Sequence, residues 1–160
     1  MEKFKIEFKW AMVFSLSLLF WMYFEKIMGW HSEKIKFQPI YTMLFGFVAV
    51  IIYVFAILDK KKNHFNGTQD WKKGFLSGAI LSLLIAAFNP IVQYLSYEVI
   101  SPNFFTNIIS SKIEHKRMSL IDAEKYFTLS NYIYFSTFSS LSYGIVTASI
   151  VAYFVKSKTN

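Results

Sequence analysis

The chain has 160 residues, of which 54% are hydrophobic, 20% aromatic and 17% charged, and its formal net charge is +7. Its mean hydropathy is positive, at +0.36. This composition excludes a disordered chain, since disorder requires low hydrophobicity and dense charge. The sequence contains no cysteine, which excludes disulfides, thiolate metal sites and a cysteine nucleophile. A charged fraction below the usual quarter favours a membrane protein over a water-soluble domain.

Four long stretches without a charged residue divide the chain, at residues 10–24, 37–58, 74–97 and 126–155. A bilayer core about 30 Å thick needs roughly 20 apolar residues of helix, and a charge at mid-span costs about 2.5–3.5 kcal/mol. We therefore predict an all-α polytopic membrane protein, a bundle of four transmembrane helices that forms a single domain over residues 1–160. The predicted spans cover about residues 10–30, 38–58, 74–97 and 129–155.

The first uncharged stretch is the shortest and also suits the core of a signal peptide. No small-residue cleavage site follows it, because the chain continues with the aromatic and charged residues 23–26. Extension to Trp30 gives about 30 Å of helix, with Trp10 and Trp30 as anchors at the two interfaces. We expect a retained span, with Glu25 and Lys26 near the headgroups and no ionisable side chain within the four spans proper.

Basic residues near the ends of the spans predict the orientation. The face shared by the two termini and the second connection carries ten of them: Lys3, Lys5, Lys9, Lys60, Lys61, Lys62, Lys72, Lys73, Lys156 and Lys158. The opposite face carries seven: Lys26, Lys34, Lys36, Lys112, Lys116, Arg117 and Lys125. We therefore expect a multi-pass protein of the inner (cytoplasmic) membrane with both termini in the cytoplasm. Because the lysines cluster at the ends of spans, and the chain has only one arginine, we expect the lipid bilayer as partner and no nucleic acid.

The connection between the third and fourth spans, about residues 102–127, predicts an amphipathic helical segment. Ser101-Pro102 fits an N-cap followed by proline at the first helical position, and Ser119 with Asp122 fits the start of a second piece. Apolar residues recur at helical spacing in the first piece: Phe104, Phe105, Ile108, Ile109 and Ile113. We expect this face to lie in the headgroup layer. The alternative is a helical hairpin whose apolar side covers the end of the bundle.

Small residues recur at every fourth position in the last two predicted spans. They are Gly74, Gly78, Ser82 and Ala86 in the third, and Ser136, Ser140, Gly144 and Ala148 in the fourth. Such stripes let helix backbones approach closely in lipid. Two alternatives remain open: the stripes pack these two helices together within one chain, or one of them serves a homodimer or a membrane-protein partner.

The third span also contains a polar kink formed by Asn89, Pro90 and Gln93. Pro90 removes a backbone donor, and Asn89 and Gln93 lie on one face that should avoid lipid. These residues could form a notch that binds a substrate or an ion. We favour a structural kink whose freed backbone groups are satisfied by the neighbouring helix.

The sequence contains no phosphate-binding loop, zincin helix, nucleophile elbow or EF-hand loop. His31, Glu33, Glu114 and His115 are expected on one face, but at no spacing of a known metal site, so we interpret them as solvated loop residues. We therefore expect no metal, no cofactor, no catalytic residue and no enzymatic activity. The expected role is a scaffold or partner subunit that acts through helix packing. The alternative is an oligomeric transporter or pore for a neutral or small solute, lined by the polar kink.

Three segments of the chain carry a family resemblance: Trp71–Gly78, Ile100–Phe105 and Met118–Phe127. Together with a last helix that contains Gly144 and ends in lysines, they resemble the family known as domain of unknown function 4199, whose members come mostly from Bacteroidota. The resemblance covers the last three spans well and the first span only by position. It implies a four-helix inner-membrane protein, and it implies no reaction and no catalytic residues.

Overall fold

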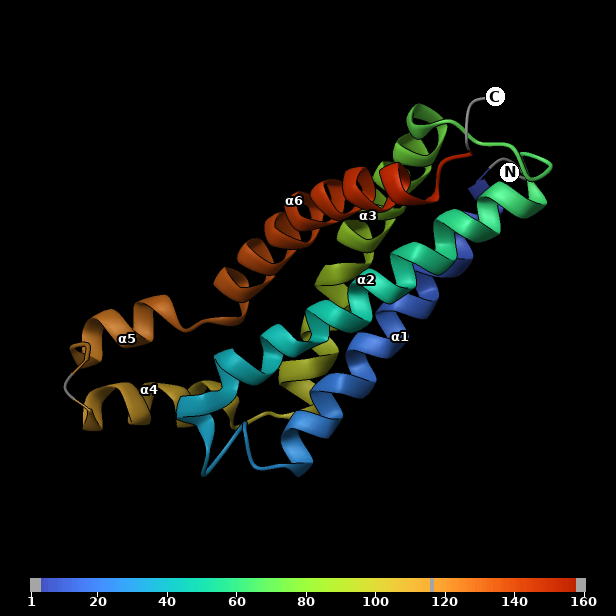
Figure 1. Ribbon diagram of the computed structural model, residues 1–160. Helices are drawn as coiled ribbons and strands as arrows, with labels where there is room; N and C mark the ends of the chain where they lie inside the picture. The colour runs from blue at the N-terminus through green and yellow to red at the C-terminus, as the bar shows by residue number, and fades with distance from the viewer. Residues whose placement is uncertain (1–3, 116, 158–160) are drawn as a thin grey trace.

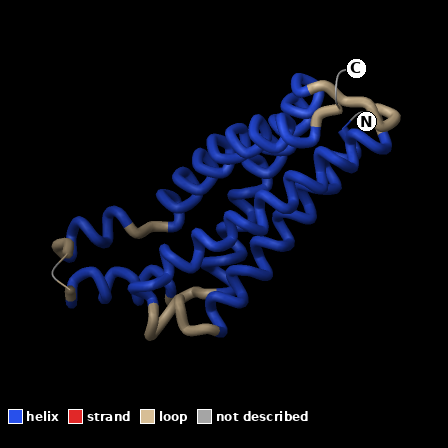
Figure 2. Tube along the Cα trace, in the orientation of Figure 1, coloured by secondary structure: helices blue, strands red, loops and turns tan. Residues whose placement is uncertain are grey.

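The computed structural model describes residues 4–115 and 117–157, so Lys3, Lys116 and Lys158 of the charge count lie outside the described residues. All regular secondary structure in the described part is helical (Figure 2). The elements are α1 (Lys5–Ile27), a 3-10 turn η2 (Ile35–Phe37), α2 (Gln38–Asn63), α3 (Trp71–Tyr94), a π turn η3 (Leu95–Ile100), α4 (Phe104–Glu114), α5 (Leu120–Tyr126) and α6 (Leu129–Val155). The all-α prediction is confirmed.

The four long helices run alongside one another, and both termini lie at the same end of the bundle as the connection between α2 and α3 (Figure 1). We call this the terminal end. The α1–α2 connection, α4 and α5 lie at the other end, which we call the hairpin end. Four segments are long and apolar enough to cross a membrane, at residues 5–27, 35–63, 71–100 and 129–155. These segments confirm the four predicted spans and describe a membrane protein.

The outward surfaces of the long helices are apolar, as contact with lipid requires. Large exposed side chains lie on α1, α2 and α6: Phe20, Met43, Phe47, Tyr134, Phe138, Tyr143 and Phe154. A helix at a water-facing surface would carry a polar face at such positions. The apolar outer surface therefore indicates, as the uncharged stretches do, that these helices are surrounded by lipid.

The helix α3 lies at the centre of the bundle, where it contacts α1, α2 and α6 and packs most extensively on α6. The two small-residue stripes meet at this interface. A Cβ atom added at Gly78 would lie 2.5 Å from the Cβ of Ala148, and one added at Gly144 would lie 2.6 Å from the Oγ of Ser82. The structure thus brings the stripes together within one chain.

The boundaries of the first span differ from the prediction. The helix α1 begins at Lys5 instead of about residue 10 and ends at Ile27 instead of Trp30. The helix continues past Glu7 and Lys9 because both charges find partners on α2: Glu7 contacts Lys60, and Lys9 pairs with Asp59. A charged residue therefore did not mark the end of this helix.

The segment between α3 and α6 forms a helical hairpin that extends sideways from the hairpin end (Figure 1). Its second helix is capped as predicted, because Ser119 Oγ accepts a hydrogen bond from the backbone nitrogen of Asp122 at 3.2 Å. The first cap is wrong: α4 starts two residues later with Asn103 as N-cap, and Ser101 binds another partner.

The amphipathic face of α4 does not lie mainly against the headgroups. Phe104 is 1% and Ile108 4% exposed, and both belong to a cluster of buried residues with Met22, Ile35, Tyr97, Ala123 and Phe127. Phe105 and Ile109 are half-buried beside it, and Ile113 is exposed. The predicted contact with the headgroups is therefore wrong for Phe104 and Ile108, because α4 folds back onto the bundle. These contacts fit the alternative of a hairpin that covers the bundle end.

Candidate functional site

A buried polar cluster at the hairpin end joins the connection between α1 and α2 to the helices around it. Glu25 is fully buried, and its Oε1 accepts hydrogen bonds from Trp21 Nε1 at 2.7 Å and Thr42 Oγ1 at 2.8 Å. Its Oε2 lies 3.0 Å from Nε2 of His31. A buried carboxylate needs such donors, because an unpaired buried charge is strongly destabilising.

His31 extends this cluster to the start of α4. Its Nδ1 lies 2.7 Å from Ser101 Oγ, and its backbone oxygen accepts a hydrogen bond from Asn107 Nδ2 at 2.9 Å. An ionised carboxylate only accepts, so in that state of Glu25 the donor is the tautomer of His31 with its proton on Nε2. The position expected for His31 in a solvated loop is therefore wrong: His31 is 3% exposed, and Glu25 beside it is fully buried.

The order Ser101–His31–Glu25 resembles that of a nucleophile, a base and an orienting acid. In serine hydrolases, however, the serine faces Nε2 of the imidazole and the acid faces Nδ1. In this protein the two nitrogens are exchanged. The same bonds also join α1, α2 and the start of α4. A structural role, in which this buried network holds the three segments together, therefore explains it.

A second buried cluster lies at the terminal end. Glu7 on α1 is 3.0 Å from Nζ of Lys60 on α2 and accepts a hydrogen bond from Ser77 Oγ on α3 at 2.8 Å. Glu7 and Lys60 are both buried, although each lies in a span-forming helix. The helices that form the first two spans thus extend past the predicted limits, and they carry Glu7 and Lys60 as a buried pair near their ends.

The sequence contains one signal that could have placed both carboxylates. Buried residues recur on α1 at steps of three, four or seven residues: Glu7, Ala11, Ser15, Met22 and Glu25. Residues at such spacing share one helix face. Ala11 and Ser15 are small residues on that face. Their presence indicates a face that contacts other helices and that can hold buried partners for the two carboxylates.

The predicted polar kink lies against α6. Asn89 Nδ2 donates to Ser136 Oγ at 2.7 Å and to Thr137 Oγ1 at 3.2 Å, and Gln93 Nε2 donates to Asn89 Oδ1 at 3.3 Å. The helix α3 continues through Pro90, and its irregular part is the π turn that begins at Leu95. These polar groups are thus engaged between two helices of the same chain.

The residues of the small-residue stripes and those of the polar kink form one continuous contact between α3 and α6. Ser136 and Ser140 are half-buried, whereas Gly144 and Ala148 are buried. On α3, Gly74 lies beside Ala152, with 3.1 Å from an added Cβ to that residue. Within residues 4–115 and 117–157, no three His, Asp or Glu side chains gather as a metal site would require.

The family comparison agrees with this architecture. A family model described as "Protein of unknown function (DUF4199)" matches residues 9–157. The chain belongs to this family. The match includes all four long helices of this DUF4199 protein almost completely, together with the α4–α5 hairpin. No match is found among the curated proteins or among the solved structures.

Proposed function

We propose that this protein is a non-enzymatic scaffold or partner subunit that binds another membrane-embedded segment at the elbow between α5 and α6, residues 118–135. One observation carries this proposal: apolar side chains of α5 are exposed although α5 precedes the fourth span. Ile121 is 77% exposed, and Leu120 and Tyr126 are also exposed. At headgroup level lipid covers such side chains only in part, so a partner gains from burying them.

The elbow has a fixed shape. Thr128 Oγ1 accepts a hydrogen bond from the backbone nitrogen of Asn131, and Asn131 Nδ2 donates to the carbonyl oxygens of Lys125 and Tyr126 at 3.0 and 2.9 Å. These bonds hold the end of α5 against the start of α6. A surface that is ordered before binding loses less entropy when a partner binds.

The inner side of the elbow is an open hollow of about 440 Å³. Met118, Tyr126 and Phe135 line it together with Asp122, Lys125 and Asn131. Methionine and aromatic residues are enriched at protein interfaces. Burial of one large apolar side chain contributes about 1.5–3 kcal/mol where that side chain would otherwise face water, so the contribution comes from side chains at headgroup level and not from those already covered by lipid.

The other possible functions have less support. The small-residue stripes are already used between α3 and α6, so they offer no free seam to a homodimer or a partner. A pore would need polar groups that face an open path. Asn89 and Gln93 instead bind each other and α6, and both are buried.

The proposal is tested by site-specific crosslinking in membranes of intact cells. A photoactivated residue replaces Ile121, and a matched control replaces Phe20, which is 73% exposed on α1 and lies outside residues 118–135. We expect a discrete protein product from position 121 that position 20 does not give. Its mass distinguishes a second copy of this chain from another protein.

Two results would contradict the proposal. Crosslinking at position 121 to lipid alone would show that the elbow is a lipid-contacting surface. Equal protein products from positions 121 and 20 would show unspecific contact. A variant with Ile121→Asp should lose the product formed from a second position in the elbow, such as Phe135, if the apolar contact is the cause.

We also propose that this protein is located in the inner membrane, with the terminal end in the cytoplasm. The lysines at 60–62 and at 72 and 73 flank the connection between α2 and α3, and they support this orientation. Reporter fusions after Asn66 and after Ser119 should report opposite compartments, with Asn66 cytoplasmic. The same compartment for both would contradict a four-span topology, and the reverse pattern would contradict the orientation.

A further inference from the structure

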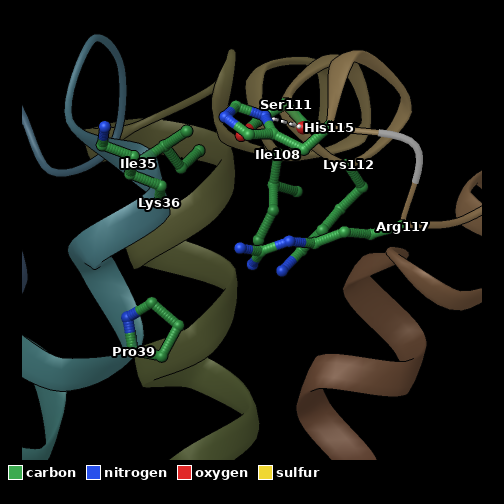
Figure 3. A pocket seen from close by; sticks show the side chains of 8 residues that line it. All are labelled: Ile35, Lys36, Pro39, Ile108, Ser111, Lys112, His115 and Arg117. Atoms are coloured by element: carbon green, nitrogen blue, oxygen red, sulfur yellow. Dashed lines mark hydrogen bonds between the residues drawn. The ribbon is translucent and has the colours of Figure 1, made fainter.

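We propose that the basic rim of the pocket between the start of α2 and the helix α4 binds the phosphate of an anionic glycerophospholipid headgroup. The pocket itself has an accessible volume of about 10 Å³, enough for one water molecule, so the phosphate lies at its mouth. The pocket is separate from the elbow between α5 and α6. Its lining comes from η2, α2, α4 and the turn after α4 (Figure 3). The lining residues are Ile35, Lys36, Pro39, Ile108, Ser111, Lys112, His115 and Arg117.

The charge of this pocket has one sign. Lys36, Lys112 and Arg117 line it, and no aspartate or glutamate does. None of the ion pairs between described residues includes these three side chains. Figure 3 shows the ends of Lys112 and Arg117 side by side, and Lys36 on the opposite wall. Cations that converge without a counterion repel one another, so a bound anion stabilises the arrangement.

The backbone holds the two converging cations in place. The backbone nitrogen of Arg117 donates to the carbonyl oxygen of Lys112 at 3.0 Å, which ties Arg117 to the end of α4. The ring of His115 lies over the same turn, with Nδ1 2.8 Å from the carbonyl oxygen of Ser111. Arg117 is the only arginine in the chain. Its planar guanidinium can bind two phosphate oxygens at once, whereas a lysine acts as a point charge.

The depth of the pocket favours a lipid over a soluble phosphate. The second membrane-crossing segment begins at Ile35, so Lys36 and Pro39 lie where hydrocarbon gives way to headgroups. Further along α2, Met43 and Phe47 follow Pro39 at four-residue steps, and all three are exposed. This strip can contact acyl chains while the phosphate lies at the mouth of the pocket. Basic pockets beside transmembrane helices bind anionic headgroups in this way.

The test uses the full chain in neutral detergent, titrated with dihexanoyl phosphatidylglycerol and followed by native mass spectrometry. The variant Lys112→Gln with Arg117→Gln removes both converging charges. The matched control, Lys26→Gln with Lys34→Gln, removes the same charge from the same end at exposed residues outside the pocket. Each basic residue near anionic lipid contributes about 1 kcal/mol, so the double variant should bind about 10- to 30-fold more weakly. The control should bind like the wild type.

Two further probes identify the source of the phosphate. Dihexanoyl phosphatidylcholine should bind at least several-fold more weakly than phosphatidylglycerol, because its headgroup has no net charge. Inorganic phosphate at the same concentration should neither bind nor displace the lipid. Equal binding of the two lipids, unchanged binding by the Lys112 and Arg117 variant, or displacement by inorganic phosphate would overturn the proposal. The variant Arg117→Lys, which keeps the charge and the fold, should have intermediate affinity.

Discussion

The close contact between α3 and α6 makes a direct prediction for Gly78. In Gly78→Ala, the added Cβ would lie 2.5 Å from the Cβ of Ala148 and 3.2 Å from its Cα. The same atom would lie 3.2 Å from Cδ1 of Ile57 on α2. Carbon atoms in contact normally lie about 3.5–4.0 Å apart. Because one of the obstructing atoms belongs to the backbone of α6, a rotamer change cannot relieve the overlap.

The magnitude follows from comparison with a second glycine. An atom added at Gly46 on α2 would meet nothing within 4 Å. Both substitutions replace glycine by alanine inside a helix, and each therefore gains about 0.5–1 kcal/mol of helix stability. Only Gly78→Ala has the overpacking cost, which is about 1–3 kcal/mol. The unfolding free energies of the two variants should differ by that amount.

The difference can be measured by titrating the protein in mild detergent with a denaturing detergent and following tryptophan fluorescence. Adding Ala148→Gly to Gly78→Ala removes the nearest obstructing atom and should restore most of the lost free energy. If Gly78→Ala were as stable as Gly46→Ala, the close α3–α6 seam would be refuted. If the second substitution gave no recovery, the contact between residues 78 and 148 would not be the cause.

The buried charges give two further predictions, both measured by the same titration. Glu25→Ala should lower the unfolding free energy by about 3–5 kcal/mol, because it removes the acceptor facing the buried His31; a loss below 1 kcal/mol would contradict the buried cluster. Glu7→Ala should cost a similar amount, because the buried Lys60 loses a carboxylate contact, whereas Lys9→Ala at a half-exposed pair should cost less than about 1 kcal/mol. Equal losses for these two variants would contradict the assigned burial.

The existence of the four spans could be predicted from the sequence because it depends on composition alone. A membrane-crossing helix must avoid charge over about 20 residues, and that requirement does not depend on the neighbours of the helix. The positions of the small-residue stripes followed from spacing for the same reason. The stripes did not identify their partner, since a seam within the chain and a seam between chains need the same residues.

Composition alone did not predict the burial of Glu7, Glu25 and His31, and only the spacing along α1 indicates that the two glutamates share a helix face. A charge near the end of a span has the same sequence signature whether it faces water or a partner on another helix. Only the approach of Lys60 to Glu7, more than fifty residues away in the chain, makes burial possible. The face of α4 presents the same difficulty: periodicity indicates that Phe104 and Ile108 share a side, but not whether lipid or protein covers it.

The arrangement of these contacts has a physical reason. In lipid, burial of apolar surface does not hold helices together, since lipid tails are as apolar as the side chains. The middle of this bundle therefore depends on close backbone approach at Gly78 and Gly144, and its two ends depend on the clusters around Glu7 and Glu25. These contacts all lie inside the chain. Large apolar side chains on the outside can then vary without loss of the fold, and the partner surface that we propose lies on the hairpin, which extends beyond the packed helices.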